Sequence, residues 1–354
     1  MPGHNEDFEE AFRVVKIDEN TWKGAYNLEL PMKLARGVYG GHTVAQTLLV
    51  AIETTRNATT NEVFVPESFH LYFIRPGDST TPMIYKVTRL YDDEFLSKRA
   101  ITVVQKDKVR STCLCTLIKR GSKGTKEKKE APDLSTFVPP EQLKYPDPDK
   151  LYQVHHTGYV RNAYSDEFRD FTLCPEEDKL RPAERWITRR IIRPHHQQSF
   201  KDPIFNYIGL ADLSDSAMLT TLARVLHLPW NPTEDHPFQE FDSNRDARML
   251  MRNSLNILHV FHYNAMSLDH HIYFHNDDWE NNDKAYDIVK EWLCFTYQMK
   301  RLANNRTLVR GFMFNKNHKC VATVIQEGLT YMFNAVPDRA HLGDPQEPPK
   351  VSKF

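Results

Sequence analysis

The sequence predicts an α+β fold built from two tandem copies of one unit, in which a long helix is followed by antiparallel strands. Two observations lead to this prediction. Each half of the chain shows a helical pattern, then strand patterns, then a hairpin, in the same order. Short matching words recur at equivalent places: FHLYF (69–73) beside HHIYF (270–274), and RAITVVQKDK (99–108) beside RGFMFNKNH (310–318). Ordered self-similarity of this kind indicates a duplicated structural unit.

The first copy begins with a helix predicted over 41–55. Apolar residues Val44, Leu48 and Ile52 recur at intervals of four, which is typical of a buried helix face, and two glycines precede them at the helix entry. Strands are predicted at 68–78 and 82–91, and a hairpin at 99–118 that turns at 106–108.

The second copy repeats this order. A helix is predicted over 213–226 from the spacing of Met218 and Leu222, with Asp215 in its first turn, where the helix dipole favours a carboxylate. The remaining elements are a longer insertion at about 229–262, a strand at 268–275 and a hairpin at 310–333 that turns at 315–318.

Composition shifts divide the chain into four parts. Residues 119–130 contain almost no apolar side chain, and five prolines follow between positions 132 and 148. We therefore expect an N-terminal unit (1–118), a linker (119–180), a C-terminal unit that holds the candidate site (181–335) and a flexible tail (336–354). Two copies in one chain can do the work of a dimer, so we expect their sheets to pair across a pseudo-twofold axis.

The charge balance excludes several classes of function. The chain has 46 Lys and Arg against 47 Asp and Glu, so no net field attracts nucleic acid or an anionic membrane. Its apolar runs are too short to span a bilayer, and the polar start MPGHNEDFEE does not resemble a signal peptide. Five scattered cysteines favour reduced thiols and an intracellular location. Cys113 and Cys115 would share one strand face as small buried hydrophobes.

The segment NAMSLDHHIYFHNDDW (264–279) is rich in histidine and aspartate and raises the question of a metal site. On a helix, His271 and His275 would lie on one face and could share a metal ion. The matching word in the first copy favours a strand, on which these two residues lie roughly 13 Å apart, too far for one zinc ion. We therefore interpret His270 and His275 as hydrogen-bonded sheet histidines, and we expect no metal site and no cofactor.

Six short words in a fixed order resemble the acyl-CoA thioesterase II family, which includes bacterial enzymes and peroxisomal acyl-CoA thioesterases. They are GVYGGHTVAQTL (37–48), SFHLYFIRPGDS (68–79), SKRAITVVQ (97–105), LADLSDSAML (210–219), MSLDHHIYFH (266–275) and VATVIQEG (321–328). The resemblance implies a double hot-dog fold, in which each half is a long central helix wrapped by a curved antiparallel sheet. It also implies hydrolysis of fatty acyl-CoA to a free fatty acid and coenzyme A.

The resemblance assigns three catalytic residues that together position a water molecule. They are the Asp of LSD (Asp215), the hydroxyl residue two before the Asp of LDH (Ser267) and the Gln of VIQEG (Gln326). Bacterial members carry Thr where this chain has Ser267. In the first copy the matching positions fall near His42, Ser68 and Thr116, and because none is a carboxylate we expect one catalytic set per chain.

Two other functions remain open. A hot-dog hydratase or dehydratase acting on acyl-CoA would need a His–Asp pair, and none stands around LSDSAML. A non-catalytic acyl-CoA binding protein would not need Asp215 or Gln326, and both are present. The chain contains no G-x-S-x-G elbow, no G-x-G-x-x-G and no P-loop, so serine hydrolase, dinucleotide and ATP chemistry are unsupported.

The last three residues, Ser352, Lys353 and Phe354, resemble the Ser-Lys-Leu address of peroxisomal proteins, with Phe in place of Leu. We therefore expect the peroxisomal import receptor as a partner and the peroxisomal matrix as the location, with the cytoplasm as the alternative. The substrate partner is acyl-CoA, and self-association into a homo-oligomer is a further expectation. No nucleic acid partner and no membrane span are expected.

Overall fold

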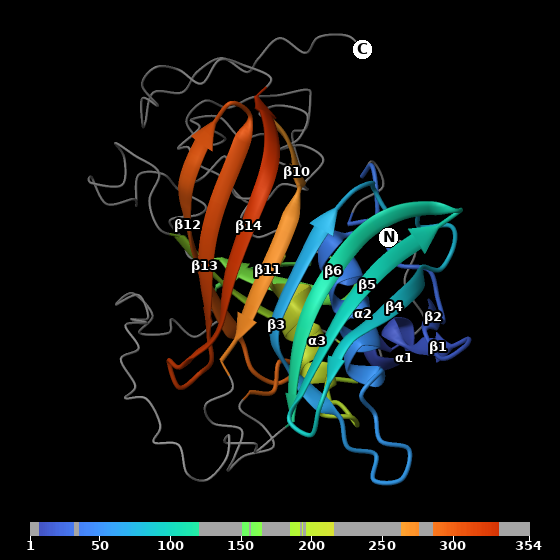
Figure 1. Cartoon of the computed structure of the whole chain (residues 1–354). Coiled ribbons are helices and arrows are strands. Elements are labelled where there is room, and N and C mark those ends of the chain that lie inside the picture. The colour runs from blue at the N-terminus through green and yellow to red at the C-terminus, as the bar shows by residue number, and fades with distance from the viewer. Residues whose placement is uncertain are drawn as a thin grey trace, which may run out of the picture.

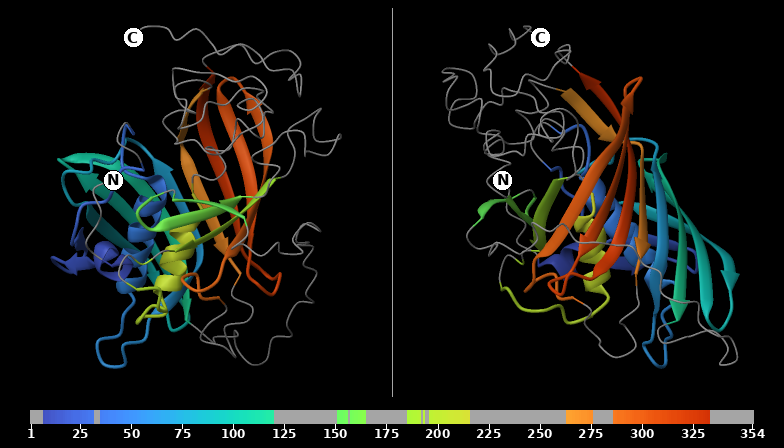
Figure 2. Two further views of the ribbon diagram at one scale, coloured as in Figure 1. Left: turned by 180° about the vertical axis from the view of Figure 1, so that it is seen from behind. Right: turned by 90° about the vertical axis from the view of Figure 1, so that its left-hand side faces the viewer.

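The computed structural model describes residues 7–31, 35–119, 151–155, 157–164, 185–191, 193, 196–215, 263–275 and 286–332. Within these residues the strands form one antiparallel sheet of 14 strands, which curves around two helices (Figure 1; Figure 2). The predicted α+β class and the duplicated arrangement of helix and sheet are thus confirmed. Helices are α1 (Phe8–Phe12), α2 (Gly40–Glu53) and α3 (Phe205–Leu213).

The sheet order places the two copies on either side of one central pair of strands. The order is β1-β2-β4-β5-β6-β3-β11-β14-β13-β12-β9-β8-β7, and β10 pairs only with β14. In the first half the strands are β1 (Val14–Lys16), β2 (Thr21–Gly24), β3 (Phe64–Phe73), β4 (Ile84–Asp92), β5 (Leu96–Gln105) and β6 (Lys108–Lys119). Beyond them lie β7 (Tyr152–His155), β8 (Val160–Tyr164), β9 (Arg185–Ile191), β10 (Tyr263–Ser267), β11 (Asp269–Phe274), β12 (Leu293–Ala303), β13 (Arg306–Phe314) and β14 (Cys320–Met332).

Both predicted hairpins are present, and each turns at a residue with left-handed backbone. Lys106 and Asp107 have φ of 50° and 57° between β5 and β6, and His318 has φ of 62° between β13 and β14. Two consecutive left-handed residues match the right-handed twist of the flanking strands, so the β5–β6 turn is a tight two-residue one.

The seam between the halves is the antiparallel pair β3–β11, and His70 lies directly opposite His271 in its register. The neighbouring pairs Phe69–Ile272 and Leu71–His270 place the pseudo-twofold axis at this histidine pair. The two Nδ1 atoms lie 3.0 Å apart, so one ring donates and the other accepts. Burial and then the neighbouring His271 lower the pKa of His70. The predicted pairing of the two sheets across the axis is confirmed.

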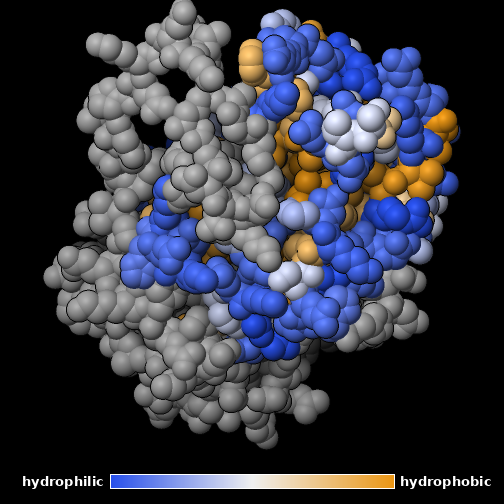
Figure 3. Space-filling model, turned by 90° about the horizontal axis from the view of Figure 1, so that it is seen from below, coloured by the Kyte–Doolittle hydropathy of each residue, from blue (hydrophilic) through white to orange (hydrophobic). Residues whose placement is uncertain are grey.

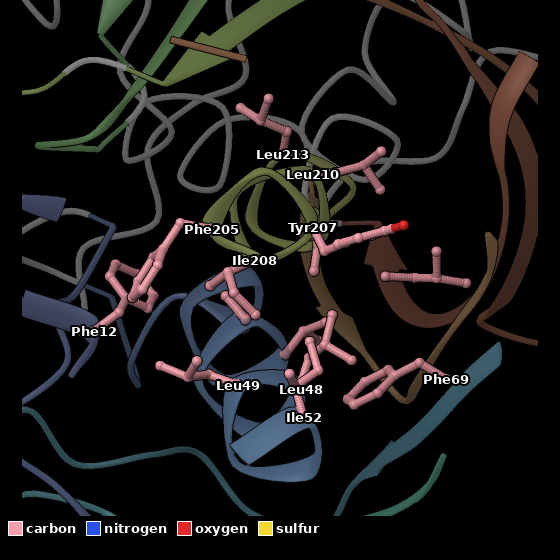
Figure 4. Close-up of a cluster of buried hydrophobic side chains, with 14 of the residues drawn as sticks. Phe12, Leu48, Leu49, Ile52, Phe69, Phe205, Tyr207, Ile208, Leu210 and Leu213 are labelled. Carbon is pink, nitrogen blue, oxygen red and sulfur yellow. The ribbon is translucent and has the colours of Figure 1, made fainter. Parts of the chain in front are cut away.

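Helices α2 and α3 pack against each other on the inner side of the sheet, and their contact is the centre of the core (Figure 4). Every residue from Gly41 to Ile52 is buried, so α2 has no exposed face over this range and is not amphipathic. In the close-up, Leu48, Leu49 and Ile52 of α2 face Ile208 of α3.

The helix predicted to begin at residue 213 does not begin there. Helix α3 spans Phe205–Leu213 and ends with Ser214 as its C-cap, so Asp215 follows a helix end instead of lying in a first turn. All nine residues of α3 are buried, and a segment without an exposed face has no amphipathic period to mark its limits. Residues 216–226 of the predicted helix lie outside the described residues.

Strands β7 and β8 fall inside the range predicted as a linker, and they extend the sheet of the second half through β9. The division of the chain at 118, 180 and 335 stays a prediction. Cys113 and Cys115 are buried on one face of β6, as the alternation predicted, and burial raises the pKa of both thiols.

On the face seen from below, the described surface is largely hydrophilic, and apolar residues show within a recess that hydrophilic residues surround (Figure 3). In the described part of the chain, no helix combines the length and apolar character needed to cross a bilayer.

The seam provides a direct test of the fold. Ile272 of β11 is fully buried, whereas its neighbour Tyr273 points to the opposite face and is 40% exposed. We expect Ile272→Ala to lower the free energy of unfolding by about 2–5 kcal/mol, because the halves are joined through this strand and cannot close the cavity. Tyr273→Ala, the matched control, should cost under about 1 kcal/mol. Chemical denaturation measures both, and equal losses would contradict the assigned faces of β11.

Candidate active site

The carboxylate of Asp215 lies where the end of α3 meets the beginning of α2. An ideal Cβ placed on Gly40 would stand 2.4 Å from Asp215 Oδ2, and one on Gly41 would stand 2.5 Å from the backbone oxygen of Asp212. Only glycine at these two positions allows so close an approach. The glycine pair at the entry of α2 therefore brings a residue of the second half against a helix N-terminus of the first half.

Two side chains of the first half hold the segment that carries Asp215. The Tyr39 hydroxyl lies 3.0 Å from the backbone oxygen of Asp212 and 2.9 Å from that of Asp215. His42 Nδ1 donates to Asp212 Oδ1 at 2.7 Å, and both side chains are buried. These contacts cross from α2 to α3, so the position of Asp215 depends on both halves of the chain.

Gln326 and Ser267 complete the site from β14 and β10. The Gln326 amide nitrogen donates to Asp215 Oδ1 at 2.6 Å and to Ser267 Oγ at 2.6 Å, which uses both of its hydrogens. Ser267 Oγ also lies 3.5 Å from Asp215 Oδ1. Gln326 Oε1 is buried and has no hydrogen-bond partner among the described residues. The structure thus brings together the three side chains that the sequence singled out.

A β-bulge gives this part of the sheet its unusual geometry. In β11, His271 lies opposite Ile325, but in β10 Ser267 lies opposite Gly328, so the register differs by one residue and Leu268 is the extra one. In a regular strand, residues three apart point to opposite faces. The bulge cancels this alternation, so Ser267 and His270 both face Asp215.

His270 is fully buried beside the three residues. Its Nε2 lies 2.8 Å from Ser214 Oγ, and its Nδ1 lies 4.0 Å from Asp215 Oδ1. Burial lowers the pKa of His270 to about 4, so the ring is neutral at neutral pH. His275 Nε2 pairs with Thr323 Oγ1 at 2.9 Å. The interpretation of His270 and His275 as hydrogen-bonded histidines is confirmed.

The His, Cys, Asp and Glu side chains of the described residues form no group of three arranged to hold a metal ion. Asp269, which the sequence places next to His270, forms a hydrogen bond at the bulge instead. Its Oδ1 accepts the backbone N–H of Glu327 at 2.7 Å. The carboxylate therefore satisfies a backbone donor that the register shift leaves free.

The sequence missed the residues that hold Asp215 in place. The His42–Asp212 pair joins residues 170 positions apart, and no short motif signals such a contact. The available signal was the word GVYGGH, in which two glycines at a helix entry indicate a close backbone approach. His42 and Asp212 thus form a His–Asp pair near LSDSAML, where the sequence alone showed none. Three aromatic rings, from Phe12, Tyr39 and Tyr159, pack edge-on against His42.

The registers also correct the equivalent positions in the first copy. A bulge at Glu67 in β3 matches the one at Leu268, because the pairing shifts between Pro66 and Ser68. His70 pairs with Leu114 as His271 pairs with Ile325. The counterparts of Ser267 and Gln326 are therefore Pro66 and Cys115, one or two residues from the predicted Ser68 and Thr116. Neither has a hydroxyl or an amide side chain.

Comparisons with known proteins match both halves of the chain to acyl-CoA thioesterase domains. The family described as acyl-CoA thioesterase N-terminal domain matches residues 28–119, and the one described as acyl-CoA thioesterase C-terminal domain matches residues 139–330. The chain is 24% identical to the peroxisomal acyl-coenzyme A thioester hydrolase 1 of Saccharomyces cerevisiae, over 91% of this chain and 93% of that protein.

Solved structures share the fold at low sequence identity. Acyl-CoA thioesterase II TesB2 from Mycobacterium marinum superposes with a TM-score of 0.57 at 20% identity, over 92% of this chain and 98% of the other. A hot-dog protein from Alicyclobacillus acidocaldarius gives a TM-score of 0.54 at 14% identity, over 92% and 98%. These likenesses confirm the double hot-dog fold. Because the thioesterase C-terminal domain alone covers more than half of the sequence, the chain belongs to the acyl-CoA thioesterase II family.

Proposed function

We propose that this chain hydrolyses fatty acyl-CoA to a free fatty acid and coenzyme A, with a water molecule activated by Asp215, Ser267 and Gln326. The observation that carries the proposal is the convergence of these side chains from three elements. One amide nitrogen joins Asp215 Oδ1 and Ser267 Oγ at 2.6 Å each. A carboxylate held by an amide and a hydroxyl group is suited to orient a water molecule and to accept its proton.

Each member of the trio has a distinct task. Asp215 accepts a proton from the attacking water. Gln326 donates both amide hydrogens to the other two residues, which leaves its buried Oε1 as an acceptor for a water O–H. Ser267 accepts from Gln326, so its own hydrogen is available to Asp215 or to the water. A water molecule that donates one hydrogen to Asp215 and the other to Gln326 Oε1 keeps its oxygen lone pairs for attack on a carbonyl carbon.

The N-terminus of α2 supplies the complementary charge. The first N–H groups of a helix have no partner within the helix, and its dipole places partial positive charge at this end. Gly40 brings that end against Asp215, so a thioester oxygen bound there lies close to the activated water. Donors fixed in advance stabilise the negative oxygen of the tetrahedral intermediate. Its collapse breaks the C–S bond, and the proton held by Asp215 neutralises the leaving thiolate.

The first test is Asp215→Asn. We expect kcat on a good acyl-CoA substrate to fall about a hundredfold or more, because the amide keeps the shape of the side chain and cannot accept the proton. Thiol release measures the rate, and circular dichroism checks that the variant is folded.

Two changes at Ser267 provide the matched comparison. Ser267→Thr keeps the hydroxyl that Gln326 contacts and should leave kcat nearly unchanged, whereas Ser267→Ala removes it and should lower kcat. Near-normal turnover by folded Asp215→Asn would rule out this mechanism. A loss in Ser267→Thr as large as that in Ser267→Ala would contradict the role of the hydroxyl, because Thr keeps this group.

The proposed location is the peroxisome, and the name of the yeast relative supports it. Ser352, Lys353 and Phe354, which lie outside the described residues, resemble an address read by the import receptor. We expect deletion of these three residues to release a fluorescently tagged full chain from peroxisomes into the cytosol, as seen by microscopy. An unchanged distribution would contradict this role of the tripeptide. Self-association stays a prediction.

A further inference from the structure

His270 has a defined tautomer. Ser214 Oγ lies 2.8 Å from the backbone oxygen of Ala211 and 2.8 Å from His270 Nε2. A carbonyl oxygen only accepts, so the single hydroxyl hydrogen of Ser214 points to Ala211. Ser214 Oγ must then accept from His270, and Nε2 carries the ring hydrogen. In a neutral ring Nδ1 is left with a lone pair.

The lone pair on Nδ1 faces Asp215. This atom is buried, has no hydrogen-bond partner among the described residues and lies 4.0 Å from Asp215 Oδ1. The distance exceeds that of a hydrogen bond by roughly 1 Å, which a small side-chain rotation can close. A carboxylate cannot donate to it, but a protonated carboxyl group can.

Other groups beside the Asp215 carboxylate donate hydrogen bonds to it or place positive charge next to it. Gln326 donates to Oδ1 at 2.6 Å, Ser267 approaches it at 3.5 Å, and the N-terminus of α2 stands against Oδ2 through Gly40. The N–H donors and the positive helix end interact with the ionised carboxylate, and an N–H group cannot accept a hydrogen bond from its protonated form. A base in such surroundings works better if its protonated form also has a partner.

We propose that His270 is that partner: a positioning residue whose Nδ1 accepts a hydrogen bond from Asp215 once this carboxylate has taken a proton from water. The inference rests on the proposed function and adds a fourth residue to it.

The proposed cycle accounts for the proton that leaves the attacking water. Water adds to the thioester carbonyl carbon, and its proton moves to Asp215 Oδ1. The new O–H then donates to His270 Nδ1, which holds the proton near the intermediate without removing it from Asp215. When the C–S bond breaks, the same proton passes to the coenzyme A sulfur, and His270 returns to its starting state.

The charges around His270 are compatible with this role. Asp215 faces it from the end of α3, and Asp269 and His271 flank it on β11. Burial, which outweighs both carboxylates, lowers the pKa of the ring to about 4, so Nδ1 keeps its lone pair at neutral pH. Below that value the ring gains a proton at Nδ1 and can no longer accept.

Two substitutions separate the two ring nitrogens. In His270→Gln the longer side chain reaches the Nε2 position and keeps a contact with Ser214, but nothing replaces Nδ1. In His270→Asn the amide oxygen takes the Nδ1 position, and the contact with Ser214 is lost. We expect kcat to fall about 10–100-fold in the Gln variant, as for loss of a hydrogen bond in a charged site, with KM and the unfolding midpoint nearly unchanged. The Asn variant should be less stable and should retain more of its kcat.

The pH profile of kcat provides a second readout that a structural role would not change. Both variants lose the imidazole whose pKa is about 4, so their profiles are compared with each other. Without the acceptor the protonated carboxyl is less stabilised, so the acidic limb should lie at lower pH in the Gln variant than in the Asn variant. Wild-type kcat in the Gln variant, with its limb at the same pH as in the Asn variant, would overturn this inference. If Asp215→Asn is inactive and His270→Gln is normal, only the role of His270 is lost; if Asp215→Asn turns over normally, the proposed function is lost as well.

Discussion

The close approach of the α3 end to the N-terminus of α2 is the constraint on which the site depends. An ideal Cβ on Gly40 would stand 2.4 Å from Asp215 Oδ2 and displace the carboxyl group, and one on Gly41 would stand 2.5 Å from the backbone oxygen of Asp212. The approach combines a carboxylate from one half with a helix N-terminus from the other. Neither half alone holds both the base and the positive helix end, which gives a physical reason for the two copies to function as one unit.

The continuous sheet keeps this arrangement in place. Strands β3 and β11 join the halves, and β14 runs alongside β11 and β10, so Gln326 and Ser267 are anchored to the same seam. The bulge at Leu268 then turns Ser267 to the side of His270. Buried polar groups are costly unless they have partners, and the trio satisfies this condition mutually, with Gln326 Oε1 and His270 Nδ1 as atoms that the reaction can use.

Local patterns in the sequence predicted most of the fold. The spacing of Val44, Leu48 and Ile52 marks α2, and the turn at residues 106–108 marks a hairpin that needs no distant partner. The repeated words FHLYF and HHIYF indicated the duplication, and in the structure they form the seam, where they pair around His70 and His271. The three site residues followed from family resemblance, since nothing in their local spacing requires them to meet.

What the sequence did not predict has a common cause, which is that tertiary contacts override local periodicity. Helix α3 is buried on all sides, so its true end at Leu213 leaves no trace in the polar pattern. Alternation along a strand assigns Ser267 and His270 to opposite faces, and only the register against β14 shows the bulge that reverses this. The His42–Asp212 contact joins distant parts of the chain and has no motif at all.

Turnover by Gly40→Ala tests the central claim most directly. Alanine is the better helix former, so α2 itself should not suffer, but the new methyl group would occupy the space of Asp215 Oδ2. Displacement of a catalytic group by about 1 Å costs roughly a hundredfold in rate, and we expect a loss of this size in kcat. Gly158→Ala is the control, because the three atoms nearest to its added carbon all belong to the Glu29 side chain, with Oε2 at 3.1 Å. Wild-type turnover by folded Gly40→Ala would contradict the account.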